Sequence, residues 1–166
     1  MRRPTRWRRA EVLDVGTWQE QVRDGTRPRA SVVVLDVEPW VAHWRTGQRE
    51  LDDAVERLGR EWGDQHVHVV TNSARGVSDG LLPASWRYLR VARKPFTRLQ
   101  VPPGAVVVGD QPLQDGLLAW RLGATFVAVP LPRDAPLWAR LLHAASTPVS
   151  RLWLRRVTAP EPEQVH

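Results

Sequence analysis

Acidic side chains follow two apolar runs that have the composition of buried strands. Asp36 ends the run SVVVLD, and Asp110 follows AVVVG, with Asp115 five positions further along. A buried carboxylate without a partner is energetically unfavourable, so this pattern calls for a cation, a set of hydrogen-bond donors or an exposed turn. Carboxylate oxygens are preferred ligands of hard divalent cations. The spacing therefore predicts a Mg²⁺ site that the three carboxylates share.

Hydrogen-bond donors follow the other predicted strands. Thr71 and Asn72 come after the run VHVV, and Lys94 comes after a short apolar segment. Lys94 is the single Lys among 24 basic residues, and its compact ammonium fits between a carboxylate and a phosphate better than the planar fork of Arg does. A hydroxyl, an amide and an ammonium beside a bound cation suit a phosphate ester. The set of residues therefore predicts phosphate chemistry.

Apolar runs and helical periodicities alternate along the chain. We expect strands at 31–36, 67–71, 87–92, 105–109 and 125–129, and helices at 16–24, 48–62, 76–82, 113–122 and 135–144. This alternation predicts an α/β fold, a Rossmann-like three-layer sandwich whose mainly parallel sheet has about five strands with helices on both faces. In such sheets ligands bind beyond the carboxyl ends of the strands, where the acidic and donor residues are expected to meet.

The length of 166 residues and the hydrophobic content of 42% predict one domain with one sizeable core. We expect this domain at 11–147, after a basic arm at 1–10 and before a basic, irregular tail at 148–166. The chain has no Cys, which excludes disulfides, thiolate metal sites and cysteine nucleophiles. Any metal must therefore be bound by oxygen or imidazole.

The net charge of +6 comes almost entirely from Arg, and this bias alone does not predict specific binding of nucleic acid. No apolar stretch is long enough to span a membrane and no secretion signal is recognisable, so a cytoplasmic location is expected. The segment RLWLRR at 151–156 is compatible with peripheral contact on anionic lipid and equally with packing on the protein itself.

The linker between 95 and 105 is too short for a full helix before the next strand. Either the preceding segment pairs differently, or one face of the sheet stays open. An open apolar face would accept a protein partner or a second copy of the chain in a homodimer. The aromatic residues close enough in sequence to line it are Trp86, Tyr88 and Phe96.

Four segments in order resemble the motifs of the haloacid-dehalogenase-like (HAD) phosphatases: LDVE, VVTNS, RKP and VVGDQPLQDG. Their spacing is most similar to the small IIIA-type group without a large cap domain, which includes phosphatidylglycerophosphate phosphatases. The resemblance covers about residues 12–156. It implies a Mg²⁺-dependent phosphomonoester hydrolase that acts on a phosphorylated substrate through an aspartyl-phosphate.

The resemblance also implies catalytic roles. Asp36 would be the nucleophile, and Glu38 would stand where the family has its general acid and base. Lys94 would balance the negative charge gathered around Asp36. The phosphoryl group would be held by Thr71, Asn72 and Lys94.

The same resemblance implies a set of metal ligands. Asp36, Asp110 and the backbone carbonyl of Glu38 would bind Mg²⁺. Asp115 would hold the water ligands of the ion.

The first motif is degenerate, because this chain has Glu38, Pro39 and Trp40 where the family has an Asp followed commonly by Asn or Asp and Thr. The extra methylene displaces the carboxyl by roughly 1 Å, and a displacement of that size can reduce turnover about a hundredfold. Pro39 also favours an extended backbone at Glu38. A catalytically impaired HAD-like binding or scaffold protein is therefore the alternative.

Two further patterns have weaker interpretations. The sequence DVE at 36–38 also resembles the Asp-x-Glu motif of a family of two-metal nucleases, but the helical periodicity at 48–62 does not match the strands that follow that motif there. His66 and His68 alternate along one strand and have no evident third ligand, which favours packing or surface roles over a metal site.

Overall fold

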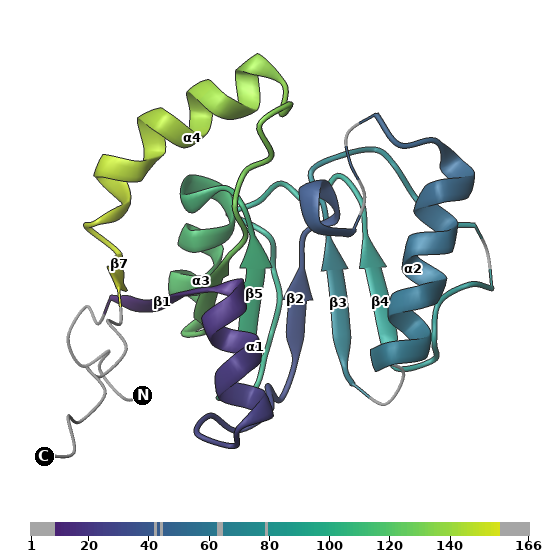
Figure 1. The fold of residues 1–166 in the computed structure, drawn as a ribbon, viewed down its shortest axis with the longest axis horizontal. Coiled ribbons are helices and arrows are strands. Elements are labelled where there is room, and N and C mark those ends of the chain that lie inside the picture. The colour runs from purple at the N-terminus through teal and green to yellow at the C-terminus, as the bar shows by residue number, and fades with distance from the viewer. Residues whose placement is uncertain (1–8, 42, 44, 63–64, 79, 157–166) are drawn as a thin grey trace, which may run out of the picture.

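The apolar runs of the sequence form the strands of one parallel sheet (Figure 1). The computed structural model describes residues 9–156 except 42, 44, 63, 64 and 79. Neighbouring strands are parallel throughout, in the order β4-β3-β2-β5-β6-β1-β7. The strands are β1 (Ala10–Asp14), β2 (Val33–Leu35), β3 (Val67–Val70), β4 (Trp86–Leu89), β5 (Val106–Gly109), β6 (Thr125–Ala128) and β7 (Leu154–Arg156).

Helices cover both faces of this sheet, which confirms the three-layer α/β sandwich. Alternate residues of a strand point to opposite faces, so Val108 belongs to the buried cluster that contains Leu51 of α2, and Val107 to the one that contains Leu118 of α3. None of the described helices has the length and apolar composition needed to cross a membrane. The helical segments are α1 (Val15–Arg23), η1 (Val37–Val41), α2 (Gln48–Trp62), η2 (Pro112–Gly116), α3 (Leu117–Leu122) and α4 (Leu137–Ser150).

The sheet has seven strands rather than the expected five, because both ends of the described chain join it. β1 lies between β6 and β7, and Ala10 is paired with Leu154. The prediction of an irregular tail from 148 is therefore wrong for these residues, since α4 continues to Ser150 and β7 follows. The rest of the expected arm and tail, residues 1–8 and 157–166, lies outside the described residues.

The helix expected at 76–82 does not form in the described part of this segment. The backbone N–H of Ser78 donates to Asp52 of α2 at 3.1 Å, and the Ser78 hydroxyl donates to the same carboxylate at 2.5 Å. Gly80 has a φ of 83°, a conformation that ends a helix rather than continuing it. Contacts with α2 therefore hold the segment as a loop.

The short linker before β5 does not leave the sheet face open. Its residues Leu99 and Val101 pack against the apolar cluster on the α3 side of the sheet. Trp86 is buried and Tyr88 half-buried on the opposite side, against α2, whereas Phe96 is 71% exposed. The three aromatic residues therefore do not share one exposed surface.

The direction in which the chain crosses the sheet reverses between β2 and β5. From β2 the strands continue outward through β3 to β4, and from β5 they continue the other way to β6. In open parallel sheets, ligands bind beyond the carboxyl ends of the strands at such a reversal. Asp36 follows β2 and Asp110 follows β5, so the fold places both residues at this point.

Candidate active site

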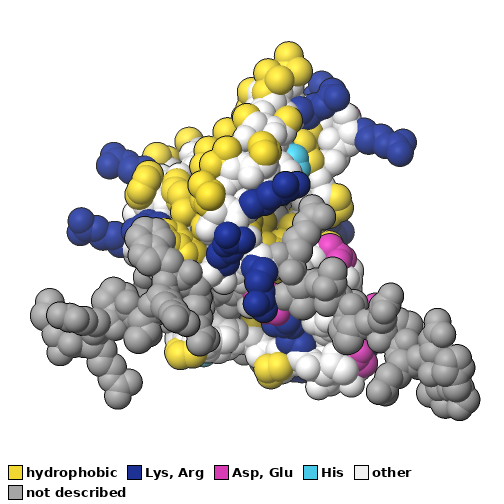
Figure 2. Space-filling model, turned by 90° about the vertical axis from the view of Figure 1, so that its left-hand side faces the viewer, with side chains coloured by type: hydrophobic (Ala, Val, Ile, Leu, Met, Phe, Trp, Pro, Cys, Tyr) yellow, Lys and Arg dark blue, Asp and Glu magenta, His cyan; other side chains and the backbone are white. Residues whose placement is uncertain are grey.

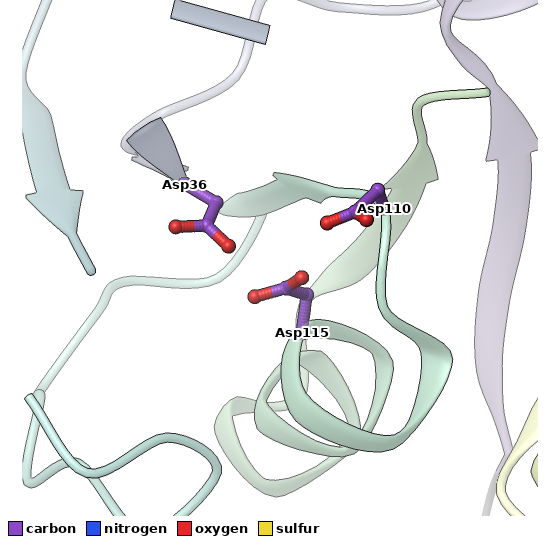
Figure 3. Close-up of side chains that lie close together, drawn as sticks. All are labelled: Asp36, Asp110 and Asp115. Carbon is purple, nitrogen blue, oxygen red and sulfur yellow. The ribbon is translucent and has the colours of Figure 1, made fainter. Parts of the chain in front are cut away.

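Three carboxylates converge where β2 and β5 end (Figure 3). Asp36 follows β2, Asp110 follows β5, and Asp115 lies in η2 one turn further along. One carboxylate oxygen from each lies within 4.8 Å of the others, which is close enough to bind a metal ion. The three residues that the sequence predicted as a shared site are therefore brought together.

Lys94 lies at the centre of this cluster. Its Nζ lies 2.5 Å from Oδ2 of Asp36 and 2.6 Å from Oδ1 of Asp115, and its side chain is 1% exposed. The predicted pairing of Lys94 with Asp36 is thus present. The residue also pairs with Asp115, a contact that the sequence analysis did not predict.

The loop that carries Lys94 is held by the segment after β3. The Asn72 Oδ1 accepts a hydrogen bond from the Lys94 backbone N–H at 2.6 Å. Val91 and Arg93, on either side of Ala92, have φ values of 51° and 56°, which is unusual for residues other than Gly and most of all for β-branched Val. Such strain persists where surrounding contacts fix the backbone, and it is common at functional sites.

The charges in the cluster perturb one another. Burial raises the pKa of Asp36 well above its usual value, although Lys94 opposes the change. Burial and the charge of Asp115 raise the pKa of Asp110 from 3.8 to about 7. Burial alone would lower the pKa of Lys94, but Asp115 and Asp36 outweigh it and leave that pKa raised. Lys94 therefore stays protonated. Its single positive charge does not neutralise the three carboxylates around it.

The donor set fits a divalent cation. Three carboxylates and one ammonium give the cluster a formal charge of 3 × (−1) + 1 = −2. The buried Oε1 of Gln111, next to Asp110 in sequence, accepts no hydrogen bond within the described residues. Oxygen ligands and this charge are what a hard divalent ion requires.

A close backbone approach places Asp115. A Cβ added at Gly109 would lie 2.4 Å from Cγ of Asp115, so no larger residue fits at the end of β5 without moving this carboxylate. The other Asp115 oxygen, Oδ2, accepts from the Gln111 backbone N–H at 3.1 Å. The Gly of the fourth motif is therefore explained by its close approach to Asp115.

Glu38 has a different set of partners. Its Oε1 accepts from Nη1 of Arg75 at 3.1 Å, and its Oε2 accepts from the Thr71 hydroxyl at 3.3 Å. The backbone at Glu38 has φ −96° and ψ 137°, which confirms the extended conformation predicted from Pro39. Glu38 is not part of the metal-binding group found among the described residues, so the geometry gives no support to a two-metal Asp-x-Glu nuclease.

Arg75 is a site residue that sequence reasoning missed. Besides Glu38, its guanidinium donates to the backbone carbonyls of His43 at 3.1 Å and Thr46 at 2.6 Å. These bonds fix the guanidinium beside the cleft. No signal in the sequence distinguished Arg75 from the other Arg residues, because its partner lies 37 positions away.

These residues border a cleft of about 370 Å³. The buried side chains of Lys94 and Asp115 lie behind its wall and do not line it. The Asn72 side chain lines the cleft, but its carboxamide is already hydrogen-bonded. Its Oδ1 accepts from the Lys94 backbone N–H, and its Nδ2 donates to Oε1 of Gln114. The lining residues are Asp36, Glu38, Thr71, Asn72, Ser73, Arg75, Asp110, Gln111, Gln114 and Trp138.

The helix α4 forms part of the cleft wall, which the sequence did not reveal. Trp138 lines the cleft, and the Gln111 side chain bridges Oδ2 of Asp110 at 2.9 Å and the backbone carbonyl of Ala139 at 3.2 Å. Nδ1 of His143 lies 2.8 Å from the backbone carbonyl of Asp110. The position of Asp110 therefore depends on α4.

His66 and His68 do not contribute to the site. His66 is exposed just before β3, and His68 is half-buried within it. Burial lowers the pKa of His68. Neither residue belongs to the metal-binding group found among the described residues, in agreement with the packing or surface role predicted for them.

Comparison with known proteins assigns no family: no protein-family model, curated protein or solved structure matches the chain.

Proposed function

We propose that the protein is a Mg²⁺-dependent phosphomonoester hydrolase of HAD type that acts through an aspartyl-phosphate on Asp36. The observation that carries this proposal is the buried contact between Lys94 and Asp36, at the end of β2, with Asp110 beside it at the end of β5. A carboxylate that is both exposed to a cleft and paired with a buried ammonium suits a nucleophile that must approach an anionic phosphate.

Asp36 and Asp110 would hold Mg²⁺, with Asp115 behind them and the Glu38 carbonyl as a further ligand. When bound, the ion would neutralise charge on the phosphoryl oxygens. The other charge in the pocket comes from the protein, since Lys94 neutralises part of the charge on Asp36 and Asp115. The Thr71 hydroxyl and the backbone amide of Asn72 are the donors we assign to the phosphoryl group.

In the first step an oxygen of Asp36 attacks phosphorus and the ester P–O bond breaks. The phosphoryl group moves to Asp36, and the leaving oxygen takes a proton from Glu38, which enters this step as a carboxylic acid and leaves it as a carboxylate. In the second step water attacks the aspartyl-phosphate and gives its proton to Glu38, which releases inorganic phosphate and regenerates Asp36. Arg75 holds the Glu38 side chain in the cleft for both proton transfers.

Hydrolysis of p-nitrophenyl phosphate with and without Mg²⁺ tests the proposal. We expect Mg²⁺-dependent turnover that Asp36→Asn reduces at least about a thousandfold. Asp53→Asn, at an exposed position of α2, makes the same chemical change away from the cleft and should retain full activity. Equal turnover by Asp36→Asn and the wild type would refute the proposal.

The fixed position of Glu38 favours a second candidate, a HAD-like binding or scaffold protein that binds Mg²⁺ and phosphate without turnover. Glu38 is 7% exposed and is tied to Arg75, which limits its access to a leaving group. Calorimetric binding of phosphate in the presence of Mg²⁺, with no hydrolysis by either the wild type or Asp36→Asn, would support this candidate. Turnover gained by Glu38→Asp would show an impaired enzyme instead.

A further inference from the structure

The outward side of α4 is apolar along its whole length. Its large exposed side chains and that of Leu152, just beyond the helix, are between 48% and 72% exposed. They lie at helical spacing, with Ala144, Ala145 and Pro148 exposed between them. Figure 2 shows these hydrophobic side chains gathered over α4. The large residues are Leu137, Trp138, Leu141, Val149 and Leu152.

Basic side chains border this apolar face. Arg133, Arg140 and Arg151 are exposed on α4 or beside its ends, no Asp or Glu occurs between 135 and 155, and the preceding Asp134 pairs with His43 at 3.3 Å. Figure 2 shows several Lys or Arg side chains around the hydrophobic ones. The surface is therefore both apolar and cationic, and a fitting partner must be apolar and anionic.

A hollow of about 510 Å³ lies at the N-terminal end of this face. Arg133 and Arg140 line it together with Leu137 and Leu141. Two guanidinium groups at the edge of an apolar hollow match a phosphate group attached to a hydrocarbon chain, because Arg binds phosphate oxygens through paired hydrogen bonds.

We propose that the outer face of α4, with Leu152, is a docking surface for an anionic lipid membrane, on which the helix lies in the plane of the interface. Leu and Trp side chains on one side and Arg at the borders are the pattern of interfacial helices. Anionic lipids supply the charge that the Arg residues require. A symmetric contact with a second copy would bring two Arg-bordered faces together, and the like charges oppose it.

The surface revises the lipid contact that the sequence suggested at 151–156. Leu154 is 8% exposed within β7, and Nε1 of Trp153 donates to the Pro112 carbonyl at 3.3 Å, so neither side chain is available for insertion. Leu152 remains exposed and extends the face of α4. Trp138 also lines the cleft, so the test uses variants at Arg133, Arg140 and Leu141, which do not line it and keep the test separate from the phosphatase proposal.

Co-sedimentation of the full chain with lipid vesicles tests the docking surface. We expect binding to phosphatidylcholine vesicles that contain about one-third phosphatidylserine, weaker binding to pure phosphatidylcholine, and a further loss at high salt. Leu141→Glu should weaken binding about tenfold or more, because it replaces an inserted side chain with a charge that anionic lipid repels. The double variant Arg133→Gln/Arg140→Gln should lose the preference for phosphatidylserine.

Phe96→Glu is the matched control, since it makes an equivalent change at an exposed apolar residue outside α4 and should bind as the wild type does. Unchanged thermal unfolding of each variant shows that it is folded. The proposal is wrong if the wild type binds neither vesicle, or if Leu141→Glu and Phe96→Glu bind equally. A dimer in sedimentation velocity that Leu141→Glu dissociates, without vesicle binding, would assign the face to self-association instead.

Discussion

The Nζ of Lys94 lies 2.5 Å from Oδ2 of Asp36 in an environment where the Lys94 side chain is 1% exposed. The same ammonium binds Asp115 at 2.6 Å, so one cation serves two carboxylates. Removing one partner of a buried ion pair leaves an uncompensated charge, whose burial is strongly unfavourable. The stability of the site therefore depends on Lys94 before any ligand binds.

Lys94→Met should lower the free energy of unfolding by about 3 kcal/mol, measured by urea denaturation in EDTA at neutral pH. Arg57→Met, at an exposed position of α2, removes one positive charge from the surface and should change stability by less than about 0.5 kcal/mol. Equal stability of the two variants would mean that Lys94 does not compensate the buried carboxylates.

Without a metal, the protein should become less stable as pH rises. The pKa of Asp110 is raised to about 7 in the folded state by burial and by Asp115, so the folded protein holds a proton that the unfolded chain has released. The contribution of protonated Asp110 to the free energy of unfolding is fully present below about pH 4 and is lost as pH rises through about 7. This contribution is at most about 4 kcal/mol. The raised pKa of Asp36 acts in the same direction, whereas the lowered pKa of His68 opposes part of the effect.

Urea unfolding in EDTA across this pH range measures the effect. Asp110→Asn should reduce the fall in the free energy of unfolding with rising pH, and Asp53→Asn should leave it unchanged. Saturating Mg²⁺ should stabilise the protein more at pH 8 than at pH 5, because the ion binds the ionised carboxylates. Stability that rises with pH over the same range would contradict this account of the cluster.

Glu38 and Arg75 should act as one unit in catalysis. Arg75→Met removes the donor that holds Oε1 of Glu38, and we expect a loss in kcat of about tenfold to a hundredfold through misplacement of the carboxylate. Glu38→Gln should lower kcat by at least as large a factor. The double variant should be no worse than Glu38→Gln alone, whereas additive losses would show that Arg75 acts independently of Glu38.

Gly109→Ala should disturb the site through Asp115. The added methyl would lie 2.4 Å from Cγ of Asp115, so the carboxylate must move, and we expect a loss of about 1–3 kcal/mol with weaker Mg²⁺ binding in calorimetry. Gly76→Ala is the matched control, because its added methyl would make only ordinary contact, 3.5 Å from Nη1 of Arg90. Similar stability and similar Mg²⁺ affinity in both variants would show that the close approach is not required.

The sequence predicted the centre of the sheet because β2 and β5 are continuous apolar runs. The residues that follow β2 and β5 could be placed together for the same reason, since the carboxyl ends of parallel strands share one edge. β1 and β7 were missed because both mix polar and apolar residues, and β7 contains only Leu154 and two Arg. Their pairing joins positions 144 residues apart (154 − 10), which no local pattern reports.

Contacts between elements that are far apart in the sequence could not be predicted either. The hydrogen bond of Arg75 to Glu38 and the contact of His143 with the Asp110 carbonyl connect residues 37 and 33 positions apart. The loop in place of a helix at 76–82 depends on Asp52, a residue on another element. In each case a tertiary hydrogen bond, rather than local propensity, determines the structure.

A crystal structure with Mg²⁺ and orthovanadate would test the central claim most directly. We expect the ion to contact carboxylate oxygens of Asp36 and Asp110, and vanadium to lie against an oxygen of Asp36 with Thr71 beside it. Vanadate bound away from Asp36, or an ion bound at other residues while the three carboxylates contact only Lys94 and protein donors, would contradict the account.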